Sequence, residues 1–210
     1  MARVSQEHLD ARRRQILDGA ARCFARNGFH ATSMQDVLAE AGLSAGAVYR
    51  YFRSKDELIA AIADETFVRI RGAFTEATEV SPPLLPDVLI ARVLTIVLDG
   101  GIAGAERQAF ARLIVQVWAE TLRDENLAKT LAQGFGGMRE IWTGLVDAYR
   151  ANGLVPADVS SADMARTLIA TVQGFIAQQA LFGDVEIDVL REGLRGLMSM
   201  DVTAATPPTR

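Results

Sequence analysis

Two tyrosines and an arginine stand side by side near the end of the first quarter of the chain, as Tyr49-Arg50-Tyr51, and Lys55 follows shortly after them. Phenol, guanidinium and ammonium groups at this spacing are suited to binding phosphate oxygens and base edges, not to making or breaking covalent bonds. The preceding residues, Ala45-Gly46-Ala47, have small side chains that permit close approach of another surface. The pattern predicts a helix that enters a groove of a nucleic acid.

No motif in the sequence points to catalysis. The chain has two histidines and one cysteine, and it has neither a glycine-rich phosphate loop with a lysine nor a serine nucleophile motif. Glu106, Glu120 and Glu140 are single carboxylates on predicted helices, so none forms a pair for acid–base chemistry. We therefore expect no enzyme and no cofactor. We also expect no metal site, because neither His8 nor His30 has a second ligand at metal-binding spacing.

Two short helices joined by a tight turn would hold the candidate nucleic-acid contacts in place. Apolar residues recur at helical spacing in the first of them, namely Met34, Val37 and Leu38. Thr32 or Ser33 can cap this helix through a side-chain oxygen. Ala41-Gly42-Leu43 ends it, because glycine adopts positive φ at little cost. Ser44 then caps a second helix, predicted from residue 45 to about 52.

This stretch resembles the DNA-binding domain of the TetR family of bacterial transcriptional regulators. The residues that carry the resemblance are Gly28-Phe29, Thr32-Ser33, Ala41-Gly42-Leu43-Ser44, Gly46, Tyr49-Arg50-Tyr51-Phe52 and Lys55. The DNA contacts that the resemblance and the outward helical faces imply are Thr32, Ser33, Ser44, Ala45, Gly46, Ala47, Tyr49, Arg50, Tyr51 and Lys55. Tyr49, Tyr51 and Lys55 are expected on phosphates, and Arg50 with the small residues on bases. Ala47 departs from the family, which often has a longer or hydroxyl-bearing residue there, so direct base recognition is expected to be sparse.

The distribution of charge agrees with a nucleic-acid partner for one end of the chain. The protein has 210 residues and a net charge of −4. Residues 1–55 contain nine basic and five acidic residues, which leaves thirteen basic and twenty-one acidic residues for the remainder. A basic segment joined to an acidic one is typical of a modular DNA-binding protein. With no membrane-length apolar run, no signal peptide and a lone, structural Cys23, we expect a soluble cytoplasmic protein.

Helical periodicity covers almost the whole sequence and predicts an all-α fold of about nine helices. The expected ranges are 8–27, 34–41, 45–52, 55–78, 87–99, 105–122, 124–151, 160–182 and 185–200. We expect three domains: a helix-turn-helix DNA-binding domain at 1–54 (the head), a helical effector-binding and dimerisation domain at 55–200 (the body), and a disordered tail at 201–210. Gly134-Phe135-Gly136-Gly137 interrupts one long helix, and we interpret it as a kink or a site of close packing.

Aromatic and amide side chains within the apolar body helices indicate a small-molecule cavity. The candidate ligand-binding residues are Phe67, Ile70, Phe74, Gln116, Trp118, Trp142 and Gln173. The tryptophans would offer stacking surfaces and the glutamines hydrogen bonds, so the expected effector is a small apolar molecule, such as a flat aromatic compound or a lipophilic cation. The alternative is a fully packed body in which the tryptophans are core residues. Effector binding inside the body is what the TetR resemblance implies.

The end of the chain has a strong apolar stripe that needs a partner. Its members are Ile187, Leu190, Leu194 and Leu197, and the preceding helix adds small residues at Gly174 and Ala177. The partner is either the chain's own core or the same helices of a second copy, which would give a four-helix dimer interface. The resemblance favours the second alternative.

Together these features predict a dimeric, sequence-specific DNA-binding regulator, most simply a repressor released by a small apolar effector. Its operator would be nearly palindromic. Two alternatives remain from the sequence. One is a DNA-binding regulator without a small-molecule ligand. The other is an α-helical enzyme or ligand carrier whose helix-turn-helix resemblance is accidental.

Overall fold

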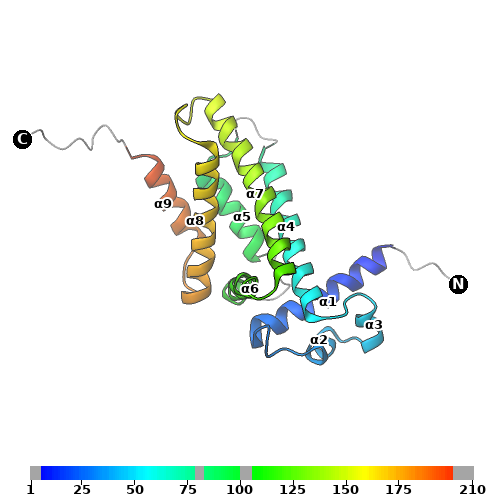
Figure 1. The fold of residues 1–210 in the computed structure, drawn as a ribbon. Helices are drawn as coiled ribbons and strands as arrows, with labels where there is room; N and C mark the ends of the chain where they lie inside the picture. The colour runs from blue at the N-terminus through cyan, green and yellow to red at the C-terminus, as the bar shows by residue number, and fades with distance from the viewer. Residues whose placement is uncertain (1–5, 79–82, 100–105, 201–210) are drawn as a thin grey trace, which may run out of the picture.

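A computed structural model describes residues 6–78, 83–99 and 106–200. Within them the chain forms nine helices and no strand, which confirms the all-α prediction (Figure 1). The helices are α1 (Gln6–Asn27), α2 (Met34–Ala41), α3 (Ala45–Tyr49), α4 (Lys55–Thr78), α5 (Pro86–Asp99), α6 (Arg107–Glu120), α7 (Glu125–Ala151), α8 (Ser161–Phe182) and α9 (Ile187–Met198). Apart from the end of α3, their boundaries lie within two residues of the predicted ones. The predicted disordered tail, residues 201–210, lies outside the described residues.

The head consists of α1, α2 and α3, and local sequence signals set its turns. Gly28, with φ +85°, ends α1, and Gly42, with φ +65°, ends α2 in the left-handed region. Ser33 caps α2: its hydroxyl accepts a hydrogen bond from the Asp36 amide at 3.2 Å, and the Asp36 carboxylate accepts one from the Ser33 amide at 2.7 Å. Hydrogen bonds from Ser33 hold the pKa of Asp36 below its usual value.

Helix α3 is shorter than predicted. It ends at Tyr49, and the Val48 carbonyl accepts hydrogen bonds from the amides of Tyr51 and Phe52 at 2.9 and 3.0 Å as the chain turns. Phe52, which follows this turn, is buried in the head core. Ser44 occupies the capping position, but its side chain makes no capping hydrogen bond, which corrects that part of the prediction.

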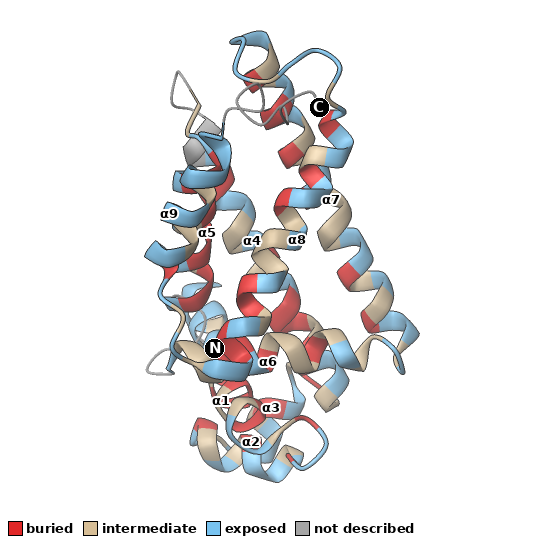
Figure 2. Cartoon of the chain, turned by 90° about the vertical axis from the view of Figure 1, so that its left-hand side faces the viewer, coloured by how far each residue is buried: buried red, intermediate tan, exposed pale blue. Residues whose placement is uncertain are grey.

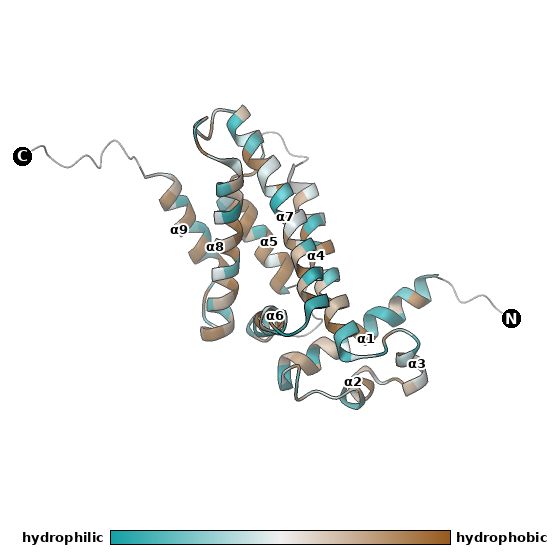
Figure 3. Ribbon diagram, viewed as in Figure 1, coloured by the Kyte–Doolittle hydropathy of each residue, from teal (hydrophilic) through white to brown (hydrophobic). Residues whose placement is uncertain are grey.

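The body surrounds a single core with long helices. In Figure 1, α4, α5, α7 and α8 run along the body, and α6 crosses at its lower end beside α1 of the head. Buried residues line the inner faces of these helices, whereas α9 is largely exposed on its outer face (Figure 2). Helix α5, strongly hydrophobic in Figure 3, lies between α4 and α9 and contacts both.

Helix α7 is continuous through the glycine-rich stretch, so this stretch is a site of close packing. At Gly134, a β-carbon would lie 2.3 Å from the nearest ring atom of Phe67 on α4. No side chain larger than hydrogen fits there unless the phenyl ring moves. At Gly137, by contrast, a β-carbon would meet nothing within 4 Å.

Candidate DNA-binding surface and ligand cavity

The outer face of α3 is open, as the sequence predicted. Ser44, Ala45 and Gly46 are exposed, Ala47 is half-buried, and a β-carbon at Gly46 would meet nothing within 4 Å. Val48 points the other way and is fully buried. The head therefore presents a nearly flat strip of small side chains that a DNA groove can approach closely.

The aromatic and basic side chains that follow this strip lie at its end. Tyr49 is 46% exposed, Arg50 is exposed and Tyr51 is half-buried against the core. Ser33 is exposed at the start of α2, but its hydroxyl is already bonded to the Asp36 carboxylate at 2.7 Å.

Some arginines of the head form ion pairs within the protein, and others are left for contact with phosphates. Arg13 pairs with Glu65, and Arg22 and Arg26 both pair with Glu40, at 2.8 and 2.9 Å. Hydrogen bonds from the two arginines hold the pKa of the Glu40 carboxyl below its usual value. In the described part of the chain no ion pair engages the remaining cations of α1 and the α3 end, which are Arg12, Arg14, Arg50 and Arg53.

Thr32 is not available to DNA, which corrects its predicted role. It is 1% exposed, and its hydroxyl donates hydrogen bonds to the carbonyls of Gly28, at 2.8 Å, and Cys23, at 3.3 Å. The side chain closes the end of α1 from inside the head, where the α1 carbonyls lack helical partners. Burial also raises the pKa of the Cys23 thiol, as expected for a packed cysteine.

Lys55 is held within the protein rather than extended into solvent. Its Nζ donates hydrogen bonds to the carbonyl oxygens of Phe29 and His30, at 2.8 and 3.4 Å, and lies 4.8 Å from the centre of the Phe29 ring. The first residue of α4 thereby fastens the loop between α1 and α2. Sequence spacing could not show this, because the partners lie 25 and 26 residues away.

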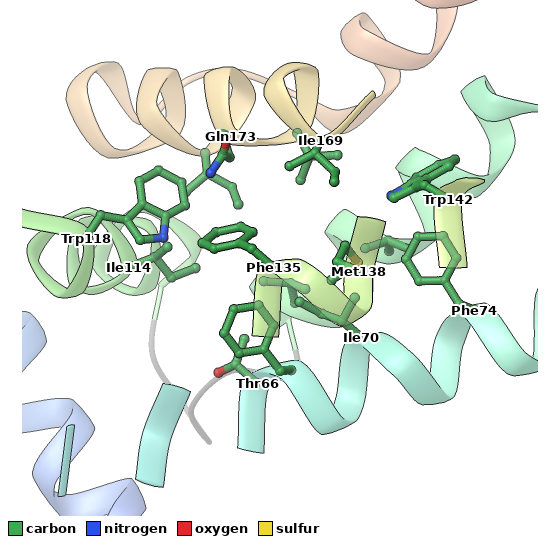
Figure 4. Close-up of a pocket in the computed structure, with 15 residues that line it drawn as sticks. Thr66, Ile70, Phe74, Ile114, Trp118, Phe135, Met138, Trp142, Ile169 and Gln173 are labelled. Carbon is green, nitrogen blue, oxygen red and sulfur yellow. The ribbon is translucent and has the colours of Figure 1, made fainter. Parts of the chain in front are cut away.

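The body contains an apolar cavity between α4, α5, α6, α7 and α8 (Figure 4). Its volume is about 80 Å³. Six of the seven predicted ligand-binding residues line it: Phe67, Ile70, Phe74, Trp118, Trp142 and Gln173. The sequence missed further members of its wall, including Ile114, Phe135, Met138 and Ile169, which no periodicity distinguishes from ordinary core residues.

Aromatic side chains line much of the cavity, and one amide in its wall, that of Gln173, is free to form a hydrogen bond. Trp142 meets Phe74 edge to face, with ring centres 4.8 Å apart, and Trp118 lies near the opposite end beside Gln173 (Figure 4). Within the described residues, the amide of Gln173 has no hydrogen-bond partner. An apolar site with one free amide can bind a mostly apolar molecule and orient a single polar group on it.

Gln116 does not line the cavity, which corrects its predicted role. It lies two residues from both Ile114 and Trp118, about 200° around α6, and so faces the opposite side. There its amide oxygen accepts a hydrogen bond from the backbone amide of Phe29 at 3.1 Å. The body thus holds the head through a side chain that is neighboured in sequence by cavity residues.

A second contact joins α6 to the same loop of the head. The Nε2 atom of His30 lies 3.0 Å from a carboxylate oxygen of Glu120, and Arg123 lies 3.3 Å from the same ring nitrogen. Gln116 and Glu120 are four residues apart and share one face of the helix. Helix α6 therefore has one face in the cavity, with Ile114 and Trp118, and another face on the head.

The predicted dimerisation stripe has a different partner from the one favoured by sequence. Ile187 is buried, and Leu190 and Leu194 pack against the core as α9 lies on α5. Only Leu197 is free, at 67% exposed. Gly174 is exposed and Ala177 is half-buried on α8.

A separate apolar surface remains uncovered at α8 and α9. Its members are Leu181, Phe182, Val189 and Leu197, each at least 66% exposed, and we call them the α8–α9 patch. Val189, Gly193 and Leu197 follow one another at four-residue spacing along α9, with open space at Gly193. The sequence pattern indicated the inner stripe of α9, which is the more regular of the two, and did not distinguish Leu181, Phe182 or Val189.

The described residues contain no group of three or more histidine, cysteine, aspartate or glutamate side chains placed to hold a metal ion. None of the described helices combines the length and the apolar character needed to cross a membrane.

Comparison with known proteins defines the class. Residues 16–62 match the family model described as bacterial regulatory proteins, tetR family, and residues 89–198 match the BetI-type transcriptional repressor, C-terminal. The helix-turn-helix head and the helical body are those of a DNA-binding transcriptional regulator. The chain belongs to the TetR family.

Three relatives give the extent of the similarity. The repressor Rv1474c of Mycobacterium tuberculosis is 47% identical over 70 residues, 33% of this chain and 37% of that protein. The regulator UidR of Escherichia coli is 26% identical over 92% of this chain and 94% of its own length. The solved structure of Salmonella enterica GusR superposes with a TM-score of 0.72 at 28% identity, covering 95% of this chain and all of that one.

Proposed function

We propose that this protein is a dimeric repressor that binds an operator and dissociates from it when a small apolar molecule binds in the body. The observation that carries the proposal is helix α6. One of its faces lines the apolar cavity through Ile114 and Trp118, and the other holds the head through Gln116 and Glu120. A ligand that moves α6 therefore acts on both parts of the chain.

The head, residues 1–54, would contact DNA through α3 and its two ends. Ala45, Gly46 and Ala47 face the bases at close range, and Arg50 reaches a base edge or an adjacent phosphate. Phosphates are bound by the phenols of Tyr49 and Tyr51. Ser44 adds a hydroxyl that makes no capping hydrogen bond at the start of α3, where a phosphate can be bound. The Ser33 hydroxyl is bonded to Asp36 and would first have to exchange that bond for one to a phosphate.

The body, residues 55–200, would form the dimer through the α8–α9 patch. Exposed apolar side chains at the ends of two adjacent helices are costly in a monomer and are buried by a second copy of the same surface. Two linked heads bind a nearly palindromic operator far more tightly than one head. Gly193 on α9 and Gly174 on α8 allow the helices of the two copies to approach closely.

The ligand would be mostly apolar with one polar group. Aromatic and aliphatic side chains make up the cavity wall, apart from Thr66 and Gln173. The hydroxyl of Thr66 already donates to the Ile62 carbonyl at 2.8 Å, so the amide of Gln173 is the group available to a ligand. Ligands typically occupy pockets of about 300–1,000 Å³. The cavity therefore has to expand, and this expansion is what displaces α6.

The proposal is tested by two coupled measurements on the full-length protein. An operator is first selected from random duplex DNA, and a panel of small apolar compounds is then titrated. Trp118 and Trp142 are the only tryptophans, and both line the cavity, so their fluorescence reports binding. The proposal requires at least one compound that both changes this fluorescence and releases the operator. DNA binding without any such compound would favour a regulator that has no small-molecule ligand.

A further inference from the structure

A second apolar void lies beside the cavity, and Phe67 is one of the side chains that line both spaces. This void has a volume of about 50 Å³ and is bounded by α4, α6 and α7, with Ala63, Leu113 and Leu131 in its wall. The two spaces have Thr66, Phe67 and Ile114 in common. Ala63 lines only the second void. Because only the three shared residues line both spaces, the position of the Phe67 ring determines whether the two spaces are connected.

The packing around Phe67 makes its ring the movable part of the boundary between the two spaces. It stands edge to face with Phe135, at 5.3 Å between ring centres, and the ring also lies directly against the backbone at Gly134, where there is no side chain. A phenyl ring changes place by rotating side-chain torsions, whereas the helices on either side keep their internal hydrogen bonds and can move only as whole units. A ligand that outgrows the cavity therefore meets a rotatable ring, with empty apolar space behind it.

We propose that Phe67 is a movable partition, and that the ligand of this site is an elongated apolar chain with one polar end. This inference rests on the function proposed above and specifies the shape of its ligand. At about 10–15 Å³ for each water-sized position, the cavity holds roughly six non-hydrogen atoms and the second void roughly four. The polar end lies at Gln173, and the chain runs past the displaced ring towards Ala63.

Straight-chain alcohols from butanol to decanol are suitable probes, because each has one hydroxyl and an unbranched chain. Burial of each added methylene raises affinity about fourfold. In the wild-type protein, affinity measured by tryptophan fluorescence is expected to rise up to about hexanol, to rise less steeply where the ring must move, and to continue rising to about decanol.

A variant that fills the second void tests the movable partition separately from the proposed release of the operator by a ligand. Ala63→Leu adds three carbons to a space for about four atoms, without touching the cavity. Hexanol is expected to bind as in the wild type, whereas decanol should lose on the order of 100-fold in affinity. Equal decanol affinities would overturn the inference, because the chain must then lie elsewhere.

A second variant acts on the ring itself and covers the case in which Ala63→Leu disturbs folding. In Gly134→Ala the new methyl group occupies the place of the Phe67 ring, so the ring is displaced before any ligand binds. The change of slope near hexanol should disappear. Gly137→Ala is the matched control, since it makes the same exchange in the same helix with nothing within 4 Å. Identical profiles in these two variants would contradict the inference.

The outcomes also distinguish the two proposals. Binding of hexanol with operator release, but with longer alcohols bound equally by wild type and Ala63→Leu, refutes only the movable partition. If no alcohol changes the fluorescence of Trp118 and Trp142, the elongated-chain inference is refuted as well. Failure of the whole compound panel, aromatic compounds included, would then refute the proposed function itself.

Discussion

The contact between Gln116 and the head gives the sharpest prediction about switching. Gln116→Ala removes the acceptor of the Phe29 amide. A hydrogen bond of this kind contributes a net 0.5–1.5 kcal/mol, roughly, to the arrangement that contains it. That range corresponds to a factor of about 2 to 13 in the balance between this arrangement and one in which α6 has moved.

The change should appear first in ligand sensitivity. If a ligand binds the moved arrangement, its apparent affinity scales with the population of that arrangement, whereas operator affinity barely changes while the original arrangement still dominates. The ligand concentration for half-release of the operator should therefore fall by about 2- to 13-fold. Anisotropy of a labelled operator duplex, titrated with the same apolar ligand, measures this directly.

Two control variants make the result specific. Gln116→Glu keeps an acceptor oxygen at the same place, so its half-release concentration should not fall. Gln178→Ala makes the same truncation at an exposed position of α8 and should behave like the wild type. If Gln116→Ala released its operator at the wild-type ligand concentration, α6 would not connect the cavity to the head in the way we propose.

Three further predictions concern stability and assembly. Because the pKa values of Asp36 and Glu40 are lowered from 3.8 and 4.5, the stability that these groups add is complete above pH 4.5 and is lost as the pH falls through their folded-state values. Thermal unfolding across that range should show a weaker pH dependence in Asp36→Asn. Lys55→Met leaves two carbonyls without their donor, at a cost of about 1–3 kcal/mol, and should lower Tm by about 2–12 °C. An unchanged Tm with a smaller salt dependence of operator binding would place Lys55 on a phosphate after all. Val189→Arg should yield folded monomers in sedimentation, whereas Leu190→Glu should unfold the body; folded monomers from both would show that Leu190 also faces the partner copy.

Local sequence signals predicted the fold well. Glycines at positions 28 and 42 and the Ser33 cap act within one turn of the chain, so their effects can be seen in a short stretch of sequence. Helix periodicity likewise predicted the long helices, because an apolar face repeats wherever a helix packs on a core.

The errors in the predicted sites arose where the partner of a residue is distant in sequence. Thr32 and Lys55 resemble surface contacts until the carbonyls they bind are located. Gln116 is flanked by cavity residues, and only the helical rotation and the position of α1 assign it to the head. The need for glycine at position 134 is likewise visible only from the position of the Phe67 ring, which lies on another helix.

In and just after α3, the residues that hold the helix in place differ from those assigned to base contacts, and this affects how the protein can acquire a new DNA sequence preference. Val48 and Phe52 hold the short helix in the head core, and both are buried. Of the positions that we assign to bases, Ala45 and Gly46 are exposed and Ala47 is half-buried, and Gly46 has open space around it. Substitutions at Ala45 and Gly46 should therefore carry little penalty to folding, and those at the half-buried Ala47 a somewhat larger one. A library randomised at Ala45 and Gly46, with small and medium side chains allowed at Ala47, would be a compact starting point for regulators directed to new operators.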